Sequence, residues 1–342
     1  MSSKNKIAVL LFIVIASLSL WLYLHNHSGT IPKELYQFEV EDTSSITKIH
    51  MTDNNGKEIL LEKKKEGGWK LNEKYLARTD AVKNLLTCIK ELKVRQPVAN
   101  SAIENVSKQL ATSATKVEIY SGEKLVKKYF VGTDTQDGLG TYMLLTDLET
   151  GENSSRPFIM FIPGFNGFLS IRYFMDEDLW RDRTVFAFYP DEISSISIKY
   201  TRIPDSSFTI SLDEKNNISL SDSKGIAVTD FDTLKAKRYI TYYTNINYEA
   251  LNNDLRKSFK DSALAKGAVH IITLRERNGK VHIVKTYSKP ADPNKLDPVT
   301  GKPDPEDLER MFALIDENSR DVALIQYYVF GKLFVSADWF RK

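Results

Sequence analysis

Residues 164–183, GFNGFLSIRYFMDEDLWRDR, gather the residue types that most often carry chemistry. The stretch holds three arginines, four acids and five aromatic side chains. Two carboxylates at the right separation can act as general acid and base, and arginine beside aromatic side chains is typical of a binding hot spot. The same composition also suits a structural corner that closes a sheet. The organisation of the rest of the chain decides between these alternatives.

The histidines do not predict a metal site. His270 and His282 lie on two strand-like segments joined by Asn-Gly at 278–279, which predicts a hairpin with a two-residue loop. That loop places His270 opposite Tyr287 and His282 opposite Arg275, on different faces of the ribbon. The other histidines have no metal-ligand spacing, and Cys88 is the only cysteine. The sequence therefore predicts no metal ion, no disulfide and no thiolate cluster.

Two acidic loops and two glycine pairs are candidate ligand sites. GTDTQDGLG at 132–140 and the proline-rich segment 291–310 lack the ligand spacing of an EF-hand. TGKP at 300–303 and GLGTYM at 138–143 are incomplete phosphate and dinucleotide fingerprints. We therefore expect solvated turns at these positions and no cofactor.

The N-terminal segment 7–24, IAVLLFIVIASLSLWLYL, has no charge, proline or glycine. A helix of that length covers roughly 27 Å, close to the thickness of the hydrocarbon core of a bilayer. A cleaved signal peptide is the alternative, but the run ends in Trp21 and Tyr23 rather than in a small-residue cleavage site. Residues 1–25 are thus predicted to be a cytoplasmic tip and transmembrane anchor, followed by a polar tether at 26–37.

Charge places the remainder of the chain outside the cytoplasm. Lys4 and Lys6 precede the apolar segment and the first charge after it is Lys33, so the positive-inside bias predicts a single-pass inner-membrane protein with a periplasmic bulk. The net charge is +2, so the part after Lys6 is formally neutral. Nucleic acid is not an expected partner, because it would require a clustered basic surplus.

The exported part contains one pattern twice. SSITKIHMTD is similar to DEISSISIKY, and each is followed by a helical segment, a hairpin and a closing piece rich in aromatic residues. The helices are predicted to start at Thr79 and Asp80 and at Thr229 and Asp230. The closing pieces align Trp180 and Arg181 with Trp339 and Arg341. We therefore expect an α+β fold of two related units, 38–188 and 189–342, each an antiparallel sheet with packed helices.

The repeat favours a structural role for most of the stretch at 164–183, because a feature present in both copies is typical of a sheet closure. Its remaining functional interpretation is a partner-binding hot spot made by Arg172, Tyr173, Trp180 and Arg181, provided that Trp180 is exposed. Free edges of the sheets are a second possible partner site.

The strings WKLNEKYLARTDAVKNLL, VGTDTQDGLGTYMLL and FIPGFNGFLSIRYFMDEDLWRDR resemble a family of membrane-anchored envelope proteins of gram-negative bacteria with a duplicated domain of unknown function. The resemblance covers nearly the whole exported part. It implies an inner-membrane anchor, a periplasmic α+β repeat, and for some members an association with ABC exporter components of the gliding type. It implies no catalytic residues.

Three functions remain open from the sequence. The first is a non-enzymatic interaction or accessory component of an envelope assembly, with an envelope or inner-membrane protein, such as an ABC exporter component, as partner. The second is a glycan- or lipid-binding module with Tyr142, Tyr173 or Trp180 as an aromatic platform. The third is a carboxylate-dependent hydrolase that acts through Asp176, Glu177 or Asp178.

Overall fold

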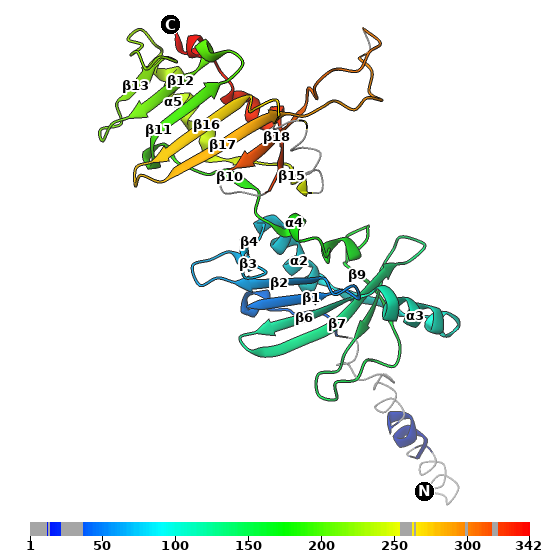
Figure 1. Ribbon diagram of the computed structural model, residues 1–342. Coiled ribbons are helices and arrows are strands. Elements are labelled where there is room, and N and C mark those ends of the chain that lie inside the picture. The colour runs from blue at the N-terminus through cyan, green and yellow to red at the C-terminus, as the bar shows by residue number, and fades with distance from the viewer. Residues whose placement is uncertain are drawn as a thin grey trace, which may run out of the picture. The chain divides into compact units, whose positions relative to one another are not determined.

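The computed structural model describes Phe12 and residues 14–21, 37–253, 262, 265–297, 300–316 and 321–342. The chain forms two compact units that meet after Asp182 (Figure 1). Each unit is built on one large antiparallel sheet with few helices. The predicted α+β class with antiparallel sheets is therefore confirmed.

Half of the predicted membrane segment 7–24, and all of the tether 26–37 except Gln37, lies outside the described residues. Residues 14–21 are helical, and their large apolar side chains are exposed, Val14 by 54% and Ile15 by 60%. No described helix has the length and apolar character needed to cross a membrane. The anchor stays a prediction.

The sheet of the first unit runs in the order β4-β3-β2-β1-β6-β7-β8-β9-β5. Its strands are β1 (Lys48–Thr52), β2 (Glu58–Lys63), β3 (Trp69–Leu71), β4 (Tyr75–Leu76), β5 (Lys93–Pro97), β6 (Thr115–Ser121), β7 (Lys124–Asp134), β8 (Thr141–Leu145) and β9 (Phe158–Phe161). The short helical pieces are η2 (Thr43–Ser45), η3 (Asn100–Ala102), η4 (Ser170–Arg172) and α4 (Glu177–Trp180).

Two longer helices, α2 (Thr79–Glu91) and α3 (Ile103–Ser113), pack on opposite faces of this sheet. Met143 of β8 belongs to the cluster that α2 covers, whereas its neighbour Tyr142 packs under α3. This arrangement follows from the alternation of side chains along a strand. Both faces of β8 are therefore occupied.

The sheet of the second unit runs in the order β13-β12-β11-β16-β17-β18-β19-β15. Its strands are β11 (Ile193–Tyr200), β12 (Phe208–Leu212), β13 (Ile218–Ser221), β15 (Ala250–Leu251), β16 (His270–Glu276), β17 (Val281–Ser288), β18 (Arg310–Ile315) and β19 (Ala323–Gln326). Its helical pieces are η5 (Pro190–Glu192), η6 (Pro204–Ser206), α5 (Thr233–Thr241), η7 (Tyr242–Thr244), α7 (Tyr327–Phe330), η10 (Gly331–Leu333) and η11 (Ala337–Phe340).

A separate two-stranded ribbon also belongs to the second unit. Strand β10 (Thr184–Phe186) pairs with β14 (Ile246–Asn247). The sequence analysis had assigned residues 184–186 to the first unit. Their pairing joins them to the second, so the unit boundary lies a few residues before the predicted one.

The two sheets share one connectivity. In each, the hairpin that follows the helix (β6 and β7, or β16 and β17) lies beside the first strand of the unit, β1 or β11. Two more strands extend the sheet, and the strand after the helix, β5 or β15, occupies the far edge. Strands β1–β3 and β5–β9 thus match β11–β13 and β15–β19 in order, whereas β4 has no counterpart in the second large sheet.

The predicted start of the second helix was wrong. Helix α5 begins at Thr233, and the Asp232 side chain caps it by accepting hydrogen bonds from two backbone N–H groups. Thr229 and Asp230 precede the helix. Leu234, the second residue of α5, is 74% exposed. In the first unit α2 does begin at Thr79, but without a side-chain cap from Arg78.

The predicted register of the β16–β17 hairpin was also wrong, by one residue. His270 lies opposite Thr286 and His282 opposite Leu274, because the loop has three residues that end in Gly279 with a φ of 89°. One residue of slip exchanges the faces. Both histidines therefore share a face, but four strand positions, or roughly 13 Å, separate them. They still do not form a common metal site.

His270 is packed within the second unit. Its ring stacks on Phe334 with 4.0 Å between ring centroids, Nδ1 lies 2.9 Å from the Thr286 hydroxyl, and only 8% of the residue is exposed. Burial, with a smaller contribution from Arg202, lowers the pKa of His270 to about 4. The folded protein therefore keeps this imidazole neutral at acidic pH values where an unfolded chain protonates it.

We predict that this histidine makes the second unit sensitive to acid. The pKa is lowered on folding, so its contribution to the free energy of unfolding is complete above about pH 6.5 and is lost as pH falls toward 4, by at most about 3 kcal/mol. Urea unfolding of the full chain across this range tests the expectation. His270→Gln should flatten the pH dependence, and an unchanged slope in that variant would contradict the assignment.

Candidate binding surface

Trp180 closes the first unit from inside. Its exposed fraction is 0%, its indole Nε1 donates a hydrogen bond of 2.8 Å to the Phe174 carbonyl, and its ring stacks on Phe174 at 4.2 Å. The Trp180 carbonyl accepts a hydrogen bond of 2.7 Å from the backbone N–H of Arg78, just before α2. The condition for a hot spot at Trp180, exposure, is not met.

Tyr173 is also a core residue, with 2% exposed. Its hydroxyl lies 3.1 Å from the Tyr129 hydroxyl and 3.5 Å from Cys88 Sγ. Burial raises the pKa of Cys88 and the pKa of each tyrosine. This cluster therefore stays neutral, and a protonated, enclosed thiol is not a nucleophile.

The acids of the stretch are engaged locally. Asp176 accepts a hydrogen bond of 3.0 Å from the Asp178 backbone N–H at the start of α4, and Glu177 accepts one of 2.6 Å from the Asn72 amide. Asp178 forms an ion pair of 3.3 Å with Arg181. These contacts tie the corner to β3 and to itself, which favours a structural role for the three carboxylates.

Arg181 belongs to the same structural corner. Its guanidinium lies 3.9 Å from the centroid of the Tyr75 ring, and its backbone bridges to Ala77. Of the four residues proposed for partner binding, Trp180 and Tyr173 are enclosed and Arg181 is held against Tyr75. Arg172 remains.

The second unit repeats this closure with a different residue. Arg341 bridges to Phe231 and pairs with Asp338 at 3.0 Å, and the Phe340 carbonyl accepts a hydrogen bond from Asp232. Phe340, with 0% exposed, therefore takes the place of Trp180. The predicted alignment of Trp180 with Trp339 was wrong by one position.

Arg172 differs from the other charged residues of the stretch. Its guanidinium lies 4.9 Å from the centroid of the Phe165 ring, and its Nε is buried without a hydrogen-bond partner. Among the described residues no carboxylate pairs with it. A half-buried cation without a counter-ion is costly for a fold, because the donor has lost water without gaining an acceptor.

Exposed apolar side chains lie on the same segment as Arg172 and on the loop of Leu139. Ile171 is 63% exposed, and Leu139 and Phe168 are each 43% exposed. The Phe168 ring lies against the loop of Leu139, since a Cβ placed on Gly138 would be 3.7 Å from it. We call Leu139, Phe165, Phe168, Ile171 and Arg172 the Arg172 surface.

A network around Asp134 positions this surface. The Asp134 carboxylate accepts hydrogen bonds from the Thr141 hydroxyl at 2.5 Å and from the Ser170 hydroxyl at 2.7 Å. The Thr141 hydroxyl oxygen in turn accepts one from the Leu169 backbone N–H at 3.1 Å. The network fixes η4, and with it Ile171 and Arg172, to the start of β8.

The loop that carries Leu139 is braced in a similar way. Asp137 accepts a hydrogen bond from the Thr135 hydroxyl and one from the Leu139 backbone N–H, and the Thr135 contact is the main cause that lowers the pKa of Asp137. These acids shape a turn, as expected for GTDTQDGLG. Within the described residues no group of three His, Cys, Asp or Glu side chains could hold a metal ion.

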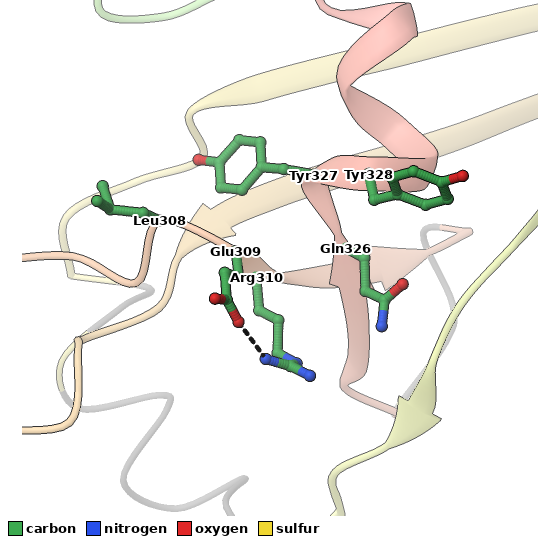
Figure 2. Close-up of a pocket in the computed structure, with 6 residues that line it drawn as sticks. All are labelled: Leu308, Glu309, Arg310, Gln326, Tyr327 and Tyr328. Carbon is green, nitrogen blue, oxygen red and sulfur yellow. Dashed lines mark hydrogen bonds and ion pairs between the residues drawn. The ribbon is translucent and has the colours of Figure 1, made fainter. Parts of the chain in front are cut away.

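The matching end of the second unit carries a cavity of about 330 Å³ (Figure 2). Leu308 lies between β17 and β18, as Leu139 lies between β7 and β8, and α7 follows β19 where the segment with Phe168 follows β9. Leu308 is 72% exposed and Tyr328 of α7 is 95% exposed. Both units thus present apolar side chains at the same place in the fold.

Sequence reasoning identified Arg172 but not its neighbours. Tyr142, Tyr173 and Trp180 were the predicted aromatic platform, yet Tyr142 packs under α3 and the other two are buried. Phe168 and Tyr328 were missed. Both residues lie in the closing segments of the two units, and this position was the only sequence signal for them. An aromatic residue there that does not align with a core position of the other unit is a candidate for binding.

Comparisons with models of known families, with curated proteins and with solved structures found no match. The resemblance to duplicated envelope proteins therefore stays a prediction.

We predict that Trp180 acts on stability and not directly on binding. Trp180→Ala removes a stacked, hydrogen-bonded indole and should lower the free energy of unfolding of the first unit by about 3–5 kcal/mol. Trp180→Phe, which introduces the residue found at the matched position of the second unit, should cost less. Urea unfolding measures both, and an unchanged midpoint in Trp180→Ala would contradict the closing role.

Proposed function

We propose that the chain is a non-enzymatic, membrane-anchored periplasmic protein, an interaction or accessory component of an envelope assembly that binds its partner through the Arg172 surface. The observation that carries the proposal is Arg172, which pairs with no carboxylate among the described residues and is preceded in the chain by exposed Phe168 and Ile171. Arginine beside aromatic and aliphatic side chains is the usual composition of an interface hot spot.

The chemistry of the surface defines the partner segment. A carboxylate would pair with Arg172, and apolar side chains beside it would cover Phe168 and Ile171. Binding would then give the Arg172 guanidinium a counter-ion and remove apolar area from water. The partner is therefore a polypeptide with an acidic residue flanked by apolar residues.

Addition of a partner strand to the sheets is less well supported. Edge strands β4 and β15 have two residues each. Edge strand β5 has a register shift after Val94 and ends in Pro97, and Ser221 of edge strand β13 bridges to Ala227 of the following loop. Short, bulged, proline-bearing or covered edges are typical protection against strand pairing.

The location rests on the N-terminal sequence. Segment 7–24 is long enough to span, and lysines on its N-terminal side orient it with the bulk of the chain in the periplasm. The partner is accordingly an envelope or inner-membrane protein, and the family resemblance implies an ABC exporter component. The matching strand orders of the two sheets support duplication of one ancestral unit.

The alternatives have weaker support. A hydrolase that uses Asp176, Glu177 or Asp178 needs two carboxylates directed at a substrate, whereas these three bind a backbone N–H, an amide and a guanidinium. A glycan site receives support from the second unit, which is treated below. No observation favours a lipid ligand.

We expect Arg172→Glu to reduce partner binding at least about tenfold, because it replaces the counter-charge of the partner carboxylate by a like charge. The measurement is the yield of photo-crosslinking from a reactive amino acid at position 171 in native membranes. Phe168→Ala should also reduce the yield.

Lys83→Glu is the matched control, since it reverses an exposed charge on α2 of the same unit. It should leave the crosslinked product unchanged. The proposal fails if Arg172→Glu folds normally by circular dichroism and gives the same product in the same yield.

The proposed topology has its own test. Alkaline phosphatase fused after Lys342 should be active, because this enzyme requires the periplasm for its disulfides. A reporter that is active only in the cytoplasm should be silent at that position. The opposite pattern, or a soluble polypeptide trimmed just past Leu24, would refute the anchored arrangement.

A further inference from the structure

The cavity of the second unit lies where β18 begins and β19 ends. Arg310 and Gln326 face each other across these two strands, and their side chains extend in the same direction (Figure 2). The lining residues are Leu308, Glu309, Arg310, Gln326, Tyr327 and Tyr328. The volume of about 330 Å³ is near the lower end for small-molecule sites, which suits one or two sugar rings.

The charges of the cavity are already compensated. Arg310 holds Glu249 through two contacts of 2.8 and 3.2 Å and Glu309 through one of 3.0 Å, while Lys295 lies 3.5 Å from Glu309. The hydrogen bond from Arg310 is the main cause that lowers the pKa of Glu249. The Gln326 side chain also hydrogen-bonds Glu249, and Arg183 contributes to the same lowering of the pKa. The charged groups of the cavity thus have partners, so neither an anion nor a cation gains a free counter-charge here.

Compensated charges still offer hydrogen bonds to a neutral ligand. Each carboxylate oxygen has more than one acceptor position, and guanidinium and amide groups carry several N–H donors. Arg310, Glu309 and Gln326 together offer donors and acceptors in the lining of one cavity. Neighbouring hydroxyl groups on a sugar ring, each both donor and acceptor, complement such an array.

The aromatic residues supply the apolar contact. Tyr328 is 95% exposed, although tyrosine normally buries most of its ring. Tyr327 beside it is half-buried, and its backbone N–H donates a hydrogen bond of 2.9 Å to the Glu309 carbonyl. Tyrosine presents a large, stiff contact area at low entropic cost. Its ring face matches the C–H face of a sugar.

We infer that this cavity binds a neutral saccharide unit of a glycan, with Tyr328 as the stacking platform and Arg310, Glu309 and Gln326 as hydrogen-bonding groups. The inference goes beyond the proposed partner function and is independent of it, because the Arg172 surface belongs to the other unit. One unit would bind a protein and the other a glycan.

The test titrates the full-length chain, held in a detergent without a sugar headgroup, with three oligosaccharides. Chitotetraose and maltotetraose are neutral probes, and tetragalacturonate is an anionic probe. Saturation-transfer NMR and calorimetry report binding. At least one neutral probe should bind with a Kd below about 10 mM and more tightly than the anion.

Variants then locate the site. Tyr328→Ala and Gln326→Ala should each weaken binding of the neutral probe about tenfold or abolish it, whereas Tyr328→Phe should retain it, because stacking needs the ring and not the hydroxyl. Tyr189→Ala, at another exposed tyrosine of the second unit, should bind as the parent does. Circular dichroism verifies the fold of each variant.

Three results would overturn the inference. One is the absence of binding of both neutral probes to the parent chain at about 10 mM. Another is equal or tighter binding of tetragalacturonate. The third is unchanged affinity in folded Tyr328→Ala, which would place any sugar site elsewhere.

Discussion

The structure of each unit depends on one backbone hydrogen bond, which joins the residue just before its helix, α2 or α5, to a residue near the end of the unit. Arg78 donates its backbone N–H to the Trp180 carbonyl, and Asp232 does the same to the Phe340 carbonyl. A helix start leaves backbone donors without partners, and an irregular closing segment leaves acceptors. Joining them through a short bridge satisfies both and places one buried aromatic side chain, Trp180 or Phe340, under the helix.

This closure explains why the charged residues of 164–183 have different environments in the first unit. The acids of 176–178 and Arg181 are used to hold the closing turn. Arg172 lies a few residues earlier, on a 3-10 turn fixed by Ser170 and Asp134, where none of those acids pairs with it. Within the described residues, Arg172 thus contacts the Phe165 ring but pairs with no carboxylate. A rigid support of this kind is what a binding site requires, since little entropy is lost on association.

Much of the architecture was predictable because it is encoded locally. The order of a helical segment and a hairpin in each copy, the helix start at Thr79 and the Asn-Gly pair at 278–279 all predicted elements that the structure contains. The failures were decided by distant contacts. Arg277 at the hairpin loop donates its backbone N–H to Glu192, a contact that no local pattern reports, and the loop there has three residues. Likewise Asp232, not Thr229 or Asp230, caps α5, and its backbone N–H is the group that bonds the Phe340 carbonyl.

The binding surfaces were harder to predict than the fold. A sequence shows that Arg172 has acids nearby, but only the backbone path shows that they are turned to other partners. The sequence also does not show which aromatic side chains are buried and which are exposed. Trp180 is fully buried, whereas Tyr328 is 95% exposed. Aligning the two units with each other improves the prediction of binding residues. A residue without an equivalent in the core of the other unit is not needed to close the sheet and is therefore free for binding.

The tie between Arg78 and Trp180 joins positions roughly 100 residues apart, a span that must be ordered before the bond can form. Until Trp180 is in place, the first turn of α2 has no closing segment beneath it and the core of the first unit is incomplete. A chain that stops short of this residue would expose the apolar face of α2 and tend to aggregate. The first unit is therefore expected to fold late, after its last residues are present.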